Sequence, residues 1–190
     1  MNKQDLIRRL MAGQILLIVC FVFYLIWWYR GFRPGTSVNR TRGFNGVLLA
    51  LTAAFGISGV AITLLSDCAT ASEMLKISPM TILIAGIVAY IGLLMITRFG
   101  FGRIVTSELL LIVAWTMLEV WVIDVLNGIG SLSETRFTAM SAVLGTAFIV
   151  SIVLYVAYYR MEEMRAFYAA MVPLAAAEVC MITLFGMVVL

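Results

Sequence analysis

The chain contains no histidine, and this absence removes several classes of chemistry. Haem held by histidine, zinc sites that use histidine, and nucleophiles activated by a Ser-His or Cys-His pair are all excluded. Cysteine is scarce too, with three isolated residues, Cys20, Cys68 and Cys180, and no CxxC pair. An odd number of scattered cysteines does not favour a disulfide framework or a redox motif. We therefore expect no cofactor and no metal site.

Charged side chains are also few. They make up 12% of the 190 residues, whereas 63% are hydrophobic and the mean hydropathy is +1.07. A soluble domain has about 25% charged residues, so the composition predicts a membrane protein in contact with the lipid bilayer. The basic residues are scattered, and we expect no nucleic-acid binding. No Walker loop or GxSxG motif occurs, which gives an enzyme no support.

What the chain does contain is long apolar runs. A bilayer core about 30 Å thick requires about 20 apolar residues in a helix. Six runs have this length: 10–29, 43–66, 77–97, 104–126, 137–159 and 166–190. They are continuous and do not alternate in polarity, which favours helices over barrel strands. We expect an all-α integral membrane protein, with six transmembrane helices in three hairpins that form a single domain over residues 1–190.

The basic residues between these runs predict an orientation. The loops after the first, third and fifth runs hold eight Lys and Arg residues, and the N-terminus with the other two loops holds five. The positive-inside rule places the first set in the cytoplasm and both termini outside. No small-residue cleavage site precedes Arg30, so we expect the first run to be a retained span, not a signal peptide. Short loops indicate a bacterial cytoplasmic membrane.

Acids within the runs are the most informative residues. An ionised carboxylate at mid-bilayer costs at least about 2.5 kcal/mol, so it must be protonated, paired or in contact with water. Glu178 lies at the centre of run 166–190, and Glu119 lies about two-thirds along run 104–126. No Lys or Arg occurs inside any run, so a proton or a bound cation is the expected compensation. Both acids are candidate sites for a cation, a proton or a small polar solute.

Helical spacing predicts which acids share a face. Glu108 and Glu119 are eleven residues apart, about 1100° of rotation, so they align within about 20°. Trp115 lies on the same stripe, which we expect to face the interior of the bundle. Asp124 is rotated by about 140° from Glu119, and we expect it near a membrane boundary. Glu108 is expected at the opposite boundary, within reach of Arg103.

Around Glu178 the sixth run is built for close packing. Pro173 removes a backbone donor and is expected to bend the helix. Three alanines at 175–177 leave little side-chain bulk beside the acid. A transporter would place Glu119 and Glu178 on a common cavity. Alternatively, each acid is protonated and only joins neighbouring helices by hydrogen bonds.

Two short segments suggest an internal repeat. Residues 119–123 (EVWVI) are similar to residues 178–182 (EVCMI). Internal repeats are frequent in transporters, although chance matches are also frequent among apolar segments.

Three functions remain open. The first is a small transporter, channel or substrate-binding membrane subunit with an acidic intramembrane site. In size and number of spans alone the chain resembles the substrate-binding subunits of energy-coupling-factor vitamin importers. Those subunits usually have an alanine-rich first span, whereas this one has only Ala12, and the expected orientation is opposite, so membership does not follow.

The second function is a non-catalytic scaffold or accessory subunit that binds membrane partner subunits or forms a homo-oligomer. The third is a membrane-embedded lipid-modifying enzyme, which the lack of histidine and of an Asp-x-x-Asp pattern disfavours. The sequence does not name a substrate.

Overall fold

The computed structural model describes residues 3–35, 42–65, 76–102 and 107–189. Most of these residues are helical and none is in a strand, and six helices are long and apolar enough to cross a membrane. The helices are α1 (Lys3–Phe32), α2 (Arg42–Leu65), α4 (Pro79–Met95), α5 (Ser107–Ile129), α6 (Glu134–Ala157) and α7 (Glu163–Val189). The π-helical turn η2 (Ile96–Gly100) extends α4, and the 3-10 turn η3 (Tyr158–Arg160) extends α6. The prediction of six long apolar helices is confirmed.

Most helices differ by a few residues from the apolar runs because capping groups set their ends. The Ser133 hydroxyl accepts a hydrogen bond from the Arg136 backbone amide at 3.3 Å, which starts α6 before its first apolar residue. Pro79 occupies the first turn of α4, where its missing amide proton is not needed. Gly130 follows α5 with a φ of +80°, a left-handed conformation that glycine adopts easily. α7 continues through Pro173 to Val189.

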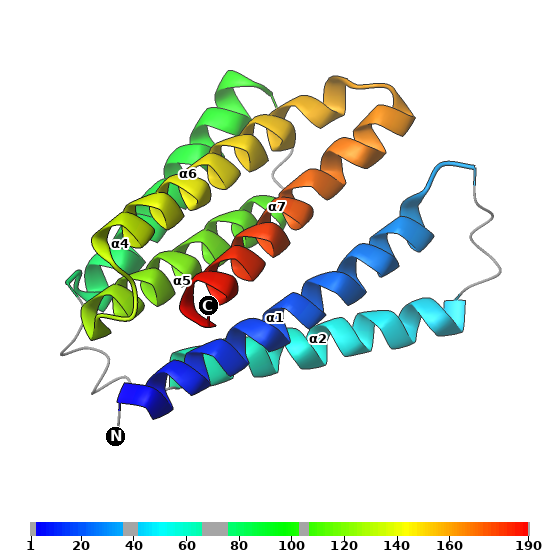
Figure 1. The fold of residues 1–190 in the computed structure, drawn as a ribbon. Helices are drawn as coiled ribbons and strands as arrows, with labels where there is room; N and C mark the ends of the chain where they lie inside the picture. The colour runs from blue at the N-terminus through cyan, green and yellow to red at the C-terminus, as the bar shows by residue number, and fades with distance from the viewer. Residues whose placement is uncertain (1–2, 36–41, 66–75, 103–106, 190) are drawn as a thin grey trace.

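α4, α6 and α1 contact α5, whereas α2 lies beyond α1 (Figure 1). α1 contacts α2 on one side and α7 on the other, α6 lies between α7 and α5, and α4 lies against α5. Within its most apolar stretch α5 is 56% buried, whereas no other helix exceeds 28%. α5 is therefore the central helix, and α2 and α4 are the peripheral ones.

The hydrophobic core lies between α1, α5, α6 and α7. Residues on α5 from Trp121 to Leu126 are all buried, so the whole circumference of this segment is covered. α1 contributes a stripe at helical spacing, consisting of Leu6, Leu10, Gly13, Gln14 and Leu17. This stripe is apolar except for Gln14, which places one amide in the core.

α1 and α2 make the closest helix contact. A Cβ on Gly13 would collide with the Thr63 hydroxyl and would lie 3.2 Å from the Gly59 carbonyl oxygen. A Cβ on Gly59 would lie 2.9 Å from the Leu17 side chain. Only glycine lets the two backbones approach to this extent, as in the small-residue interfaces of apolar helices. Gln14, the next residue after Gly13, is buried beside this contact.

Hydrogen bonds bring both chain ends to the end of the bundle where α5 leads to α6 (Figure 1). Lys3 Nζ donates to the Ile129 carbonyl at 3.5 Å, and Arg136 Nη1 donates to the Met187 carbonyl at 2.7 Å. At the opposite end the Tyr29 ring packs on Phe167, with centroids 5.9 Å apart. The termini therefore share one end.

Candidate functional site

Two polar side chains meet in the core between α1 and α5. Gln14 Nε2 donates a hydrogen bond to Glu119 Oε1 at 3.1 Å. Both side chains are 0% exposed, although 105 positions separate them in the sequence. Glu119 thus lies inside the bundle, as the helical spacing predicts.

The Gln14–Glu119 hydrogen bond uses only part of the hydrogen-bonding capacity of the two side chains. Gln14 Oε1 and Glu119 Oε2 are both buried and have no hydrogen-bond partner among the described residues. Each is an acceptor, so neither oxygen can satisfy the other while the carboxyl is ionised. A proton on Glu119 would provide the missing hydrogen-bond donor, and a small cation between the two oxygens would provide a positive charge for both. Buried polar groups without partners are costly, which favours such an occupant.

Trp115 lies one helical turn before Glu119 on the same face of α5. Its ring packs against the core, and its Nε1 donor is buried without a partner in the described structure. The predicted stripe of Trp115 and Glu119 therefore faces inward. It adds a third unsatisfied polar atom near the pair.

Apolar and weakly polar groups complete the surroundings. Leu10, Val122 and Leu184, each 0% exposed, belong to the same core cluster. Cys180, on α7, is a free thiol with 1% exposure, close enough to Glu119 to interact with the charge of its carboxyl. No cation lies among these side chains, so an ionised Glu119 would be uncompensated.

Glu178 is placed differently. It is half-buried on α7, and no hydrogen bond or ion pair is present for it within the described residues. Its neighbours alternate in exposure, because Ala177 is 2% exposed and Val179 is 59% exposed. Neither Glu119 nor Glu178 lines the cavity of about 260 Å³ beside Asp124 or the cavity of about 150 Å³ beside Tyr158. The structure thus does not bring these two acids to a common cavity among those described.

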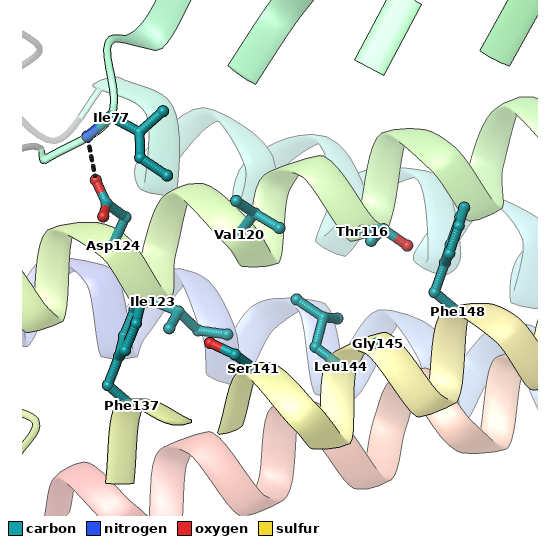
Figure 2. A pocket seen from close by; sticks show the side chains of 10 residues that line it. All are labelled: Ile77, Thr116, Val120, Ile123, Asp124, Phe137, Ser141, Leu144, Gly145 and Phe148. Carbon is teal, nitrogen blue, oxygen red and sulfur yellow. Dashed lines mark hydrogen bonds between the residues drawn. The ribbon is translucent and has the colours of Figure 1, made fainter. Parts of the chain in front are cut away.

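Asp124 is more buried than its expected boundary position implies, with 2% exposure. The reason is that the segment before α4 covers it, and the Ile77 amide donates to Asp124 Oδ2 at 3.2 Å. Asp124 also lines a cavity of about 260 Å³ between α5, α6 and the start of α4 (Figure 2). It is separate from the Gln14–Glu119 pair, which agrees with its predicted rotation away from Glu119.

Glu108 lies near the other end of α5 and is half-buried. Tyr158 donates its hydroxyl proton to Glu108 Oε2 at 3.2 Å. Tyr158 and Glu163 also line a second cavity of about 150 Å³. The expected contact with Arg103 lies outside the described residues.

Among the residues that the structure describes, no group of three or more Cys, Asp or Glu side chains could hold a metal ion. The acids are spread along α5 and α7 instead. Cys68 lies outside the described part of the chain.

The sequence reasoning missed Gln14. One signal was available: it is the only Asn or Gln in the charge-free run 10–29, and it falls on the stripe formed by Leu6, Leu10 and Leu17. An amide on the buried face of an apolar helix indicates a polar partner on another helix.

No protein-family model, curated protein or solved structure matches this chain. Its function is therefore inferred from its own residues.

Proposed function

We propose that the chain is a small multi-pass membrane protein that binds a proton or small cation at Glu119 and Gln14, and acts as a transporter, channel or substrate-binding membrane subunit. The observation that carries this proposal is the burial of Glu119 against a neutral amide, with two acceptor oxygens left without partners. Intramembrane acids are costly, and in membrane proteins they mark ion pathways and proton relays.

Several features support the membrane setting of this proposal. Six helices are long and apolar enough to span a bilayer. The outer faces of α2 and α4 carry many exposed apolar side chains, such as Ile57 (72%) and Val88 (64%). In water such faces would be unfavourable, but lipid tails solvate them. The proposed location is a bacterial cytoplasmic membrane, with both termini outside.

Flux into proteoliposomes tests the proposal. Purified protein is reconstituted, a membrane potential is imposed, and proton entry is followed with an internal pH dye and sodium entry with a radioactive tracer. We expect Glu119→Gln to reduce the flux of one of these ions at least about tenfold, the equivalent of about 1.4 kcal/mol. Glu134→Gln, the same change at an exposed position, is the matched control.

The Glu119→Gln substitution keeps an acceptor oxygen for the Gln14 amide, so the fold is expected to survive, and size-exclusion chromatography checks this. Equal flux in the wild type and Glu119→Gln would contradict the proposal, and a wild type that passes neither ion would contradict the transporter and channel functions. Glu178→Gln is measured in parallel, because the sequence also marks that acid as a site.

A second candidate function is an accessory subunit, and the placement of Glu178 favours it. This acid is half-buried on a helix face that also exposes Val179 and Ile182. A polar group beside lipid-facing residues would be satisfied by a polar side chain of a partner helix. Native mass spectrometry of the wild type and Glu178→Leu tests this. An oligomer that dissociates in Glu178→Leu would support an interface, and a wild-type monomer would contradict a homo-oligomer.

A further inference from the structure

We propose that the cavity between α4, α5 and α6 binds a single-chain alkylammonium, with its cationic head at Asp124 and its chain directed along α5. This site is distinct from the Gln14–Glu119 pair, which does not line the cavity. It therefore goes beyond the function proposed above and does not depend on it.

The shape of the cavity fits a chain with a head (Figure 2). Asp124, Ile77 and Phe137 lie at one end, and Thr116 and Phe148 lie at the other. The distance along α5 from Thr116 to Asp124 is about 12 Å at 1.5 Å per residue. The volume of about 260 Å³ is slightly below the range of about 300–1,000 Å³ found for drug-sized ligands. One short alkyl chain matches this space better than a two-chain lipid.

Apart from Asp124 and the Ser141 hydroxyl, the walls are apolar or have their polar side chain already hydrogen-bonded. The Thr116 hydroxyl donates to the Ile112 carbonyl at 2.8 Å, so it is already used within α5. Carbon atoms form most of the remaining surface, from Ile77, Val120, Ile123, Phe137, Leu144 and Phe148. These groups suit an alkyl chain.

The charge of Asp124 determines which head group of a ligand the cavity favours. Asp124 is 2% exposed and accepts one hydrogen bond, from Ile77, and it makes no ion pair within the described residues. Lys76 is the neighbour of Ile77, but its side chain is exposed and is not paired with Asp124. A buried carboxylate without a counter-charge favours a cation and repels an anion. The Phe137 ring at the same end can add a cation–π contact.

Access is from the side of the bundle. Ile77 is 40% exposed, and Ser141 and Gly145 are exposed at the rim of the cavity. An amphiphile would enter from the surrounding lipid. Since lipid tails are as apolar as the cavity walls, the alkyl chain alone gives little preference for the site. Selectivity must come from the Asp124 carboxylate.

Binding of tritiated decyltrimethylammonium to the protein in phosphatidylcholine nanodiscs tests this proposal, with scintillation proximity as the readout. We expect saturable binding that decyl sulfate does not displace. Asp124→Asn retains an acceptor oxygen for the Ile77 amide but loses the charge. We expect it to weaken binding by about tenfold or more, the range for loss of a charged partner.

A steric variant tests the position of the chain. A Cβ on Gly145 would meet no atom within 4 Å, so Gly145→Leu can extend into the cavity without a collision in the backbone. We expect this variant to abolish binding. Gly92→Leu is the matched control, because Gly92 is exposed on α4, has the same free space and does not line the cavity.

Three results would overturn the proposal: wild-type affinity in Asp124→Asn, equal displacement by decyl sulfate, or equal binding in Gly145→Leu and Gly92→Leu. Displacement by added phosphatidylethanolamine at equal concentration would also overturn it, since the occupant would then be a zwitterionic lipid. Glu119→Gln should bind the cation as the wild type does. Failure of ion flux and failure of this site are therefore distinguishable.

Discussion

Among the residues that the structure describes, the amide of Gln14 is the only hydrogen-bond donor to the buried carboxyl of Glu119, at 3.1 Å. The relationship is reciprocal, because both side chains are 0% exposed and each would lose a polar contact if the other were removed. Changes at these two positions should therefore not be additive.

Gln14→Leu should destabilise the protein by about 1–3 kcal/mol, the cost of leaving a buried polar group without a partner. The double variant Gln14→Leu/Glu119→Leu should be less destabilised than the sum of the single changes, because no polar group is then left alone. Thermal unfolding in detergent measures this. Gln4→Leu, at an exposed position of α1, is the control. Additive effects would show that the pair is not coupled.

Gly13→Ala should weaken the contact between α1 and α2. Its Cβ would collide with the Thr63 hydroxyl, and overpacking of this kind costs about 1–3 kcal/mol. Gly46→Ala should have no such effect, since a Cβ there meets nothing within 4 Å. The higher helix propensity of alanine should instead stabilise α2 by up to about 1 kcal/mol. Thermal unfolding compares the two, and equal stability of both variants would contradict the close approach.

Asp124→Ala should release the start of α4. The Ile77 amide loses the acceptor that it contacts at 3.2 Å, so its hydrogen exchange should become faster. Asp124→Asn keeps an acceptor oxygen and should exchange at nearly the wild-type rate. Peptide-level hydrogen–deuterium exchange over residues 76–82 measures both. Unchanged exchange in Asp124→Ala would mean that Asp124 does not anchor this segment.

Arg136→Ala should loosen the last turn of α7. The guanidinium contacts the Met187 carbonyl at 2.7 Å, and a cation at a helix C-terminus contributes about 0.3–1 kcal/mol. Faster hydrogen exchange at residues 184–189 is the expected result. Arg165→Ala is the control, because its ion pair with Glu162 spans 3.7 Å between two largely exposed side chains. Equal exchange in both variants would exclude the anchoring role.

Single cysteines in a background without native cysteines test the proposed orientation. Thr135→Cys and Met161→Cys introduce thiols at exposed positions near the two ends of α6. In intact cells a membrane-impermeant maleimide should label only the cysteine at 135, because the positive-inside rule places residue 161 in the cytoplasm. After lysis both should react. The inverse pattern would show that the termini face the cytoplasm.

The six helices were predictable because run length and continuity alone determine whether a segment can cross a bilayer. The inward position of Glu119 followed from its spacing to Trp115, which depends only on helix geometry. Such spacing does not identify the residue on another helix that forms a hydrogen bond with Glu119. Gln14 lies on α1, 105 positions away in the sequence, and no local pattern on α5 encodes which side of α1 faces it.

Asp124 and Glu178 also show that the position of an acid along its helix does not determine its burial: Asp124 is more buried than its position suggests, and Glu178 is less buried. Asp124 is covered by the segment that precedes α4, so its position along α5 did not indicate its burial. Glu178 is central in its run yet half-buried, because α7 presents that side away from the core. The matched segments 119–123 and 178–182 also differ, since Ile123 is 2% exposed and Ile182 is 51% exposed. Equivalent residues of these two similar sequence segments therefore do not occupy similar environments.

The separation of Gln14 from Glu119 also has a consequence for biosynthesis. α1 and α2 leave the ribosome first and can pair through Gly13 and Gly59, whereas α5 begins 42 residues after the end of α2 at Leu65. During that interval Glu119, the acceptor that the complete fold provides for the Gln14 amide, has not yet been synthesised. A chain truncated before α5 would therefore lack the acceptor that Gln14 has in the complete bundle.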